Sequence, residues 1–203
     1  MPLNASMVES VEPIPAAELR AEGLLLRAYR KDDAAALYSA VRESLASIGR
    51  WLPWCHAGYS EADSVAWIAH CSGEWTRGEM YTFAIFDSVG AEFLGAVGLS
   101  HRNREHNFAG IGYWVRESKR GRGIAARAGK LVAAFGFDRV KLTRIEILAA
   151  IDNHASRRTA ENIGGRLEGI ARNRLATPQG VVDAAVYALI PSDYAAQMRA
   201  ISS

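Results

Sequence analysis

The sequence predicts a mixed α/β (α+β) protein built on a mostly antiparallel sheet flanked by helices, and three observations support this fold class. Three apolar runs, YTFAIFD at 81–87, EFLGAVGLS at 92–100 and FAGIGYWVR at 108–116, are separated by polar or glycine-containing links and predict an antiparallel meander. Apolar residues at helical spacing predict a helix over 122–138. RIEILAAID at 144–152 is a new strand, so a parallel crossover is expected only around that helix.

The elements before the meander are one strand and two helices. GLLLRAYR at 23–30 has the apolar density of a strand, and KDD supplies a turn and an N-cap for the helix that follows. That helix is expected to stop near Trp51, because Pro53 disfavours helical backbone in the residue before it. A second helix is expected over 61–77, with apolar residues on one face.

The elements after the crossover are a short helix and a hairpin. HASRRTAENIGG predicts a helix that ends at Gly164 and Gly165, which form a strong stop signal. The runs 166–174 and 181–190 predict a terminal hairpin that closes the sheet.

Composition favours one globular domain. The chain has 203 residues, of which 49% are hydrophobic and 23% charged. We expect a flexible N-terminal extension over 1–21, a single domain over 22–195 and a tail over 196–203. Two cysteines, Cys55 and Cys71, form neither a disulfide framework nor a metal set, so a cytoplasmic protein without a metal is expected. The sequence shows no membrane span, and a net charge of +2 argues against a nucleic-acid partner.

The segment KRGRGIAA, residues 119–126, predicts an anion site at the start of a helix. The first N–H groups of a helix have no partners within it, and the helix dipole is positive there. Glycine at positions 121 and 123 lets an anion approach those donors closely. The surrounding side chains suited to phosphate are Lys119, Arg120, Arg122 and Arg127.

Taken alone, the same segment is also compatible with a simple glycine-rich turn that carries a solvated cationic face. A nucleotide P-loop is excluded, because Lys130 is followed by Leu131 and the glycine spacing is wrong. A dinucleotide fingerprint fails because the loop follows a meander strand instead of opening a βαβ unit. The neighbouring residues have to decide between the turn and the anion site.

With its neighbours, the loop resembles the acetyl-CoA-binding motif of the GNAT (Gcn5-related) N-acetyltransferases. In IGYWVRESKRGRGIA, Arg120, Gly123 and Ala125 match the R/Q-x-x-G-x-G/A consensus. GLLLRAYRKDDAAAL, SLASIGRWLPW, NHASRRTAENIGG and VYALIPSDY resemble the RimJ/RimL branch, the ribosomal-protein N-terminal acetyltransferases. The likeness covers about residues 22–195.

This resemblance implies a GNAT sheet whose central strands, FAGIGYWVR and RIEILAAID, splay apart around the pantetheine arm of acetyl-CoA. Asn153 is also suited to capping a helix, so both roles stay open. The cofactor-binding residues implied are Trp114, Val115 and Arg116 through their main chain, Arg120, Gly121, Arg122, Gly123, Ile124, Ala125 and Ala126 at the pyrophosphate, and Asn153 and Ser156 near the arm.

For catalysis, the resemblance assigns Ser156 as the acid that protonates the departing thiolate, with helix capping or pantetheine binding as alternatives. An N–H in the stretch 113–115 would stabilise the oxyanion. Many members of the branch carry a glutamate where this chain has Gly110, so the base is open. The stand-ins for the base are Glu105, His101 and His106 in the neighbouring loop, each also explained as a solvated loop residue, or else a chain of water molecules.

The acceptor side of the site is less defined. The aromatic turn WLPWCH is expected in the acceptor wall, although Trp51 is equally suited to the core. Arg172 and Arg174 are assigned either to the acceptor mouth or to solvent.

The expected function is an acetyl-CoA-dependent N-acetyltransferase that acts on a primary amine, with a protein N-terminus as the acceptor. The alternatives are an acyltransferase for a small amine or antibiotic, for which acyl groups other than acetyl stay open, and a non-catalytic acyl-CoA sensor. A homodimer is expected from the resemblance alone.

Overall fold

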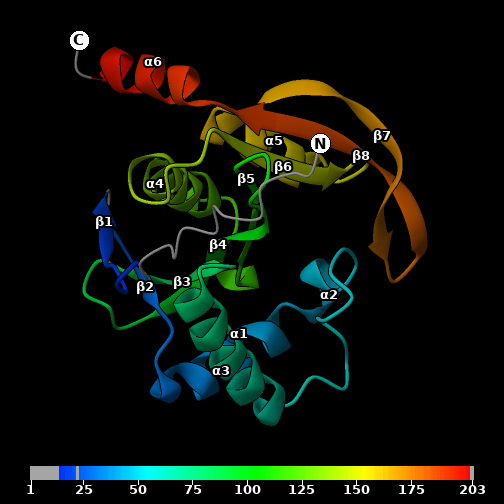
Figure 1. Ribbon diagram of the computed structural model, residues 1–203. Helices are drawn as coiled ribbons and strands as arrows, with labels where there is room; N and C mark the ends of the chain where they lie inside the picture. The colour runs from blue at the N-terminus through cyan, green and yellow to red at the C-terminus, as the bar shows by residue number, and fades with distance from the viewer. Residues whose placement is uncertain (1–13, 22, 202–203) are drawn as a thin grey trace, which may run out of the picture.

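The computed structural model describes residues 14–21 and 23–201, and in these residues eight strands form one sheet (Figure 1). The order across the sheet is β1-β2-β3-β4-β5-β6-β8-β7. The bounds are β1 Leu19–Ala21, β2 Leu24–Ala28, β3 Tyr81–Asp87, β4 Phe93–Asn103, β5 Phe108–Val115, β6 Arg144–Ala150, β7 Arg166–Thr177 and β8 Gly180–Leu189. The meander and the terminal hairpin are therefore confirmed.

Two layers of helices cover the sheet (Figure 1). Helices α1 (Ala34–Glu43), α2 (Leu45–Ile48) and α3 (Glu61–Arg77) lie on one side, and α4 (Ile124–Asp138) and α5 (His154–Ile163) lie on the other. Two single-turn 3₁₀ helices, η1 (Lys31–Asp33) and η2 (Glu117–Lys119), and the terminal helix α6 (Pro191–Ile201) complete the described elements.

Each face of the sheet has its own core, because side chains alternate between faces along a strand. On the α4 side, Phe83, Val97 and Ile111 pack in the same core as α4. On the α1–α3 side, Phe86 and Phe93 pack in a core with helix residues such as Leu37 and Val41. The strand β5 therefore presents odd-numbered side chains to α4 and even-numbered ones to α1–α3.

The pair β5–β6 is the parallel one, as predicted, with α4 as its crossover. The two strands pair over only three positions, from Phe108↔Arg144 to Gly110↔Glu146. Beyond Gly110, β5 continues to pair with β4, and beyond Glu146, β6 continues to pair with β8. The sheet therefore opens between β5 and β6, as the family resemblance implied.

The chain ends differ from the prediction. Residues 1–13 of the expected flexible extension lie outside the described residues, but Leu19–Ala21 pairs with β2 as β1. The indole Nε1 of Trp75 also donates to the carbonyl of Ile14 at 2.8 Å. Residues 196–201 of the expected tail belong to α6. The order of residues 14–21 depends on partners distant in sequence, which local patterns do not indicate.

In the described part of the chain, no helix has the length and apolar character needed to cross a membrane.

Candidate active site

The opening between β5 and β6 exposes the backbone of β5 on one edge. The N–H of Arg116 donates to Leu94 of β4 at 2.9 Å, and its carbonyl accepts from the N–H of Lys119 at 3.0 Å. Because peptide groups alternate along a strand, those of Tyr113 and Val115 face the opening while those of Trp114 face β4. This geometry supports Val115 as a main-chain ligand but argues against the same role for Trp114 and Arg116, and it adds Tyr113.

The loop after β5 ends in an uncapped helix start. Gly123 is the N-cap of α4 in a left-handed conformation with φ +69°, and no side chain caps the helix. The first hydrogen bond within α4 runs from the Arg127 N–H to the Gly123 carbonyl, at 3.1 Å. The N–H groups of residues 124–126 therefore have no acceptor within the helix. A Cβ placed on Gly121 or Gly123 meets no atom within 4 Å. An anion therefore has room to reach these donors.

Basic side chains surround this helix start, and most have exposed partners. Arg120 pairs with Glu117 at 3.1 Å, and Lys119 pairs with Glu92 at 2.6 Å. Arg122 is exposed and lies 3.5 Å from the Ser118 carbonyl. Surface ion pairs are worth about 0–1 kcal/mol, so such side chains can turn toward a bound phosphate at small cost.

Helix α1 anchors the segment that leads from β5 to this loop. Glu43, its last residue, accepts hydrogen bonds from the Arg116 guanidinium and from the Ser118 N–H. The Arg116 hydrogen bonds, with that of Ser118, lower the pKa of Glu43 to about 2. The neighbouring Ser44 Oγ accepts from the Glu117 N–H at 3.0 Å. Glu43 and Ser44 are absent from the sequence-based site, because no local motif connects them to a loop 73 residues away.

Across the opening, Tyr113 of β5 contacts Ser156 of α5. The Tyr113 hydroxyl donates to the Ser156 carbonyl at 2.8 Å and lies 3.2 Å from Ser156 Oγ. Burial raises the pKa of Tyr113 to about 12, so its hydroxyl is protonated at neutral pH. Asn153 Oδ1 accepts from the Ser156 N–H at 3.1 Å, and Asn153 is the N-cap of α5. The capping role considered for Asn153 is thus present, and Ser156 is half-buried beside the opening.

A cavity of about 600 Å³ lies on the other face of the sheet, under α1 and α3. We call it the acceptor-side cavity. Its floor includes Gly98 and Gly112, which are register partners on β4 and β5. The turn WLPWCH contributes Trp54 and His56 to it, whereas Trp51 lies under the guanidinium of Arg50 at 4.9 Å. The aromatic and titratable side chains on its α1–α3 side are Trp54, Tyr59, Trp67, Trp114, His56, Asp63 and His70.

The stand-ins for the base are not brought to the cavity. Glu105 and His106 are exposed at the tip between β4 and β5, and His101 is exposed with its Nδ1 3.0 Å from Ser100 Oγ. None of the three lines the acceptor-side cavity. The tip lies beyond Phe108, which is about 17 Å from Tyr113 at 3.3 Å per strand residue. This placement favours a solvated loop residue over a catalytic base for Glu105.

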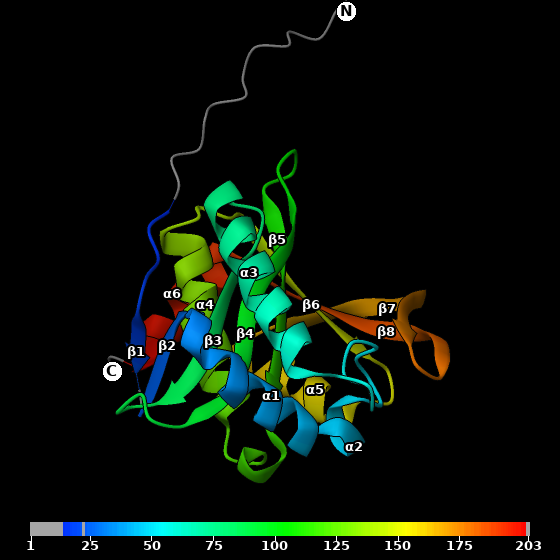
Figure 2. The ribbon, with the colours of Figure 1, turned by 90° about the horizontal axis from the view of Figure 1, so that it is seen from below.

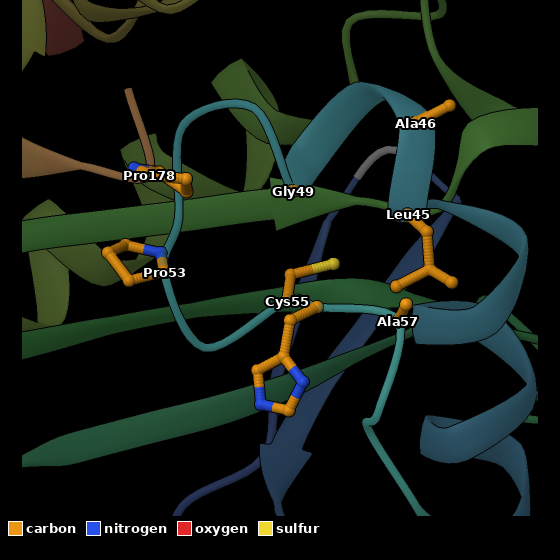
Figure 3. Close-up of a pocket in the computed structure, with 8 residues that line it drawn as sticks. Leu45, Ala46, Gly49, Pro53, Cys55, Ala57 and Pro178 are labelled. Carbon is orange, nitrogen blue, oxygen red and sulfur yellow. The ribbon is translucent and has the colours of Figure 1, made fainter. Parts of the chain in front are cut away.

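A second cavity of about 620 Å³ adjoins the first, and His56 lines both. Leu45 of α2 forms one side of it, and Pro53 and Cys55 form another. Pro178, at the turn of the β7–β8 hairpin, also lines it and is drawn beside Pro53 in Figure 3. The hairpin extends away from the rest of the sheet, as Figure 2 shows.

The two arginines assigned to the acceptor mouth or to solvent lie outside both cavities. Arg172 and Arg174 are exposed on β7, and neither lines the acceptor-side cavity or the cavity that adjoins it. The solvated assignment therefore describes their position.

Comparison with known proteins gives a consistent result. A family model described as an acetyltransferase (GNAT) domain matches residues 23–166. YdaF of Bacillus subtilis, a putative ribosomal N-acetyltransferase by name, is 26% identical over 179 residues, 85% of this chain and 94% of that protein. The ribosomal-protein-serine acetyltransferase of Escherichia coli is 26% identical over 169 residues, 83% of this chain and 93% of that protein. The structure of Mycobacterium smegmatis RimJ in complex with a CoA disulfide gives a TM-score of 0.78 at 27% identity, covering 94% of this chain and 95% of that one.

Proposed function

The chain belongs to the acetyltransferase (GNAT) domain family, and on this premise we propose that it transfers the acetyl group of acetyl-CoA to the N-terminal amine of a protein. One observation carries the proposal. The opening between β5 and β6 leads on one side to the uncapped start of α4 and on the other to the acceptor-side cavity. A thioester in the opening would meet an amine that arrives from the opposite face.

The residues present fit acetyl-CoA. We assign the pyrophosphate to the N–H donors of 124–126 and to the basic side chains of Arg120 and Arg122. The pantetheine arm would bond the main chain of Val115 and lie beside Asn153 and Ser156. The RimJ structure contains a CoA disulfide, which supports acetyl-CoA as the co-substrate.

The reaction needs few covalent parts from the chain. Bound acetyl-CoA supplies a thioester whose carbonyl carbon the neutral amine attacks. The Val115 N–H would stabilise the charge on the carbonyl oxygen, and Ser156 Oγ, 3.2 Å from the Tyr113 hydroxyl, would donate a proton to the departing sulfur and regain one from water. The imidazoles of His56 and His70 lie on the cavity wall, and we assign uptake of the amine proton to them through water.

A peptide acceptor is favoured by two adjoining cavities. The first residue would occupy the acceptor-side cavity, and the following residues would pass His56 toward the second cavity. The relative from Escherichia coli carries a ribosomal protein as the acceptor in its name. Neither the small-amine nor the sensor alternative receives comparable support.

We further propose that the protein is a cytoplasmic homodimer. A ribosomal-protein acceptor, as in the name of that relative, would be met in the compartment where ribosomes are made, which supports a cytoplasmic location. Leu167 and Ile170 of the edge strand β7 are 51% and 46% exposed. Apolar side chains on a long edge strand are suited to contact with a second copy.

The test combines binding and turnover. Isothermal titration is expected to show one acetyl-CoA site per chain. When N-terminal peptides are added to the protein and acetyl-CoA, the free thiol of CoA is expected to be released. Gly123→Glu is expected to abolish this binding while the protein stays folded, because it places a carboxylate at the anion site.

Gly23→Glu is the matched control for this variant, since Gly23 also has a positive φ (+80°) and open space around it. Any loss of thermal stability from the strained backbone should therefore be similar in both variants, and only Gly123→Glu should lose acetyl-CoA. Binding that survives Gly123→Glu would remove the anion-site assignment.

A further inference from the structure

We propose that the acceptor-side cavity selects a bulky apolar first residue, such as methionine, leucine or phenylalanine, over serine or alanine. This inference rests on the proposed function and names the substrate class of the same site. It follows from the floor, the walls and the charge of the cavity.

The floor of the cavity is bare backbone. Gly98 and Gly112 are direct partners on β4 and β5, and both face the cavity. At Gly98 a Cβ would lie 2.8 Å from the Thr82 Cα and from the Tyr81 carbonyl, so close strand packing requires glycine there. At Gly112 a Cβ meets no atom within 4 Å. The absence of a side chain at Gly112 is therefore not required by packing, and it deepens the cavity at the strand opening.

The walls are aromatic and only partly covered. Trp54 is 41% exposed and Trp67 is 39% exposed. The Trp54 ring lies 5.8 Å from the Trp114 ring and 6.3 Å from the Tyr59 ring, so three rings meet on one wall. An apolar side chain would remove this surface from water, which is favourable in proportion to the area covered. A serine or alanine side chain is too short to cover it.

The charge of the lining disfavours acidic occupants. The lining residues include neither lysine nor arginine, so no permanent cation of the lining is available to pair with an acidic first side chain. Asp63 is the carboxylate among them, and its hydrogen bonds with Ser60 lower its pKa and keep it ionised. An acidic acceptor would meet this negative charge, whereas an uncharged apolar side chain avoids it.

The experiment compares peptides that differ only in the first residue. With wild-type protein and acetyl-CoA, kcat/KM is measured for peptides that begin with Met, Leu, Phe, Ser, Ala or Asp. We expect Met, Leu and Phe to exceed Ser and Ala by roughly 10-fold or more, and Asp to react least. A preference for Ser or Ala would overturn the inference and leave the proposed function standing. If no peptide is acetylated although acetyl-CoA binds, the proposed function itself fails and the inference falls with it.

A variant tests whether the floor sets the preference. Gly112→Val fills the open space above β5, and we expect the advantage of the large residues to fall about 10-fold while the Kd for acetyl-CoA stays within twofold. Gly169→Val is the matched control, because Gly169 also lies in a strand with no atom within 4 Å of an added Cβ and lines neither cavity. Unchanged selectivity in Gly112→Val would refute the role of the floor.

Discussion

At the residue scale, Glu43 links the acceptor-side helices to the cofactor loop. Its carboxylate accepts hydrogen bonds from the Arg116 guanidinium and the Ser118 N–H, and the Oγ of its neighbour Ser44 accepts one from the Glu117 N–H. These bonds hold the segment that leads directly to Gly121 and Gly123. A carboxylate on α1 therefore sets the position of an anion site on α4.

The pKa of Glu43 makes this link measurable. A value of about 2 in the folded protein lies below the ordinary value of 4.5, so the bonds stabilise the fold above pH 4.5 and are lost as the pH falls toward 2. Because the side chain is partly solvated, we expect about 1–2 kcal/mol, less than the full shift implies. Urea unfolding of wild type and Glu43→Gln between pH 7 and 2 should show stabilities that converge in acid. A constant difference across this range would contradict the assignment.

The variant Ser156→Ala distinguishes a catalytic role of Ser156 from a role in acetyl-CoA binding. Its hydroxyl contacts Tyr113 beside the opening, so Ser156→Ala is expected to lower kcat by about 10- to 100-fold and to change the acetyl-CoA Kd less than about threefold. Thr159→Ala on the same helix is the control, since that hydroxyl donates to the Ala155 carbonyl within the helix. Thiol-release assays and calorimetry measure the two quantities. Equal losses in both would make Ser156 a binding residue.

Some site residues can be recognised from a local sequence motif, whereas others can be recognised only from the structure. Gly121, Gly123 and Ser156 lie in recognisable motifs; in the structure Gly123 is the N-cap of α4, and Ser156 contacts Tyr113 beside the opening. Glu105 is a candidate by chemistry and proximity in sequence, but the strand carries it away from the site. The roles of Tyr113 and Glu43 depend on contacts across 43 and 73 residues, which no local pattern indicates.

At the element scale, one glycine of β4 permits the close approach of the end of β5. Gly95 has φ +151°, and a Cβ there would lie 2.2 Å from the Trp114 carbonyl. The obstacle is backbone, so it does not move as a side chain would. Gly95 also pairs with Val115, whose main chain faces the opening.

Gly95→Ala is therefore expected to destabilise the protein by about 3 kcal/mol or more, through overpacking and backbone strain. Thermal unfolding measures this loss. Gly112→Ala is the comparison in the same strand pair, where the added Cβ meets nothing within 4 Å and the midpoint should stay constant or rise. Equal midpoints for both variants would show that β4 and β5 separate easily at Gly95.

Elements with strong local signals are predictable from the sequence. The helix expected over 61–77 is Glu61–Arg77, because Ser60 and Asp63 form a capping box at its start and Gly78 ends it. The strand predicted at 81–87 is β3 with the same bounds. The strand β1 lacks such a signal, since it exists through its pairing with β2.

At the scale of the whole molecule, the arrangement of the elements forms a cavity that sequence patterns do not predict. The pattern of strands and helices predicts one parallel crossover, and the motif resemblance predicts that the strands beside it splay. The cavity under α1 and α3 is not predictable in this way, because it forms where Trp54, Trp67 and Gly112 meet from three distant segments. Local sequence patterns therefore predict the fold and the cofactor loop. The cavity proposed to select the acceptor depends on contacts between segments that lie apart in the sequence.

The edge strand β7 bears on whether two copies of the chain associate. Within the described sheet β7 pairs only with β8, and most of its residues are exposed, among them Leu167 and Ile170. If a second copy covers this strand, the wild-type protein sediments as a dimer. Ile170→Lys should then shift it to a monomer, because an ammonium group buried in an apolar contact is unfavourable.

Val89→Lys is the control for this substitution, since Val89 is 81% exposed in the turn between β3 and β4. Sedimentation velocity measures the oligomeric state of all three proteins. The acetyl-CoA Kd should be unchanged in both variants, because neither residue lies at the opening between β5 and β6. A wild-type monomer, or a dimer that tolerates Ile170→Lys, would exclude this interface.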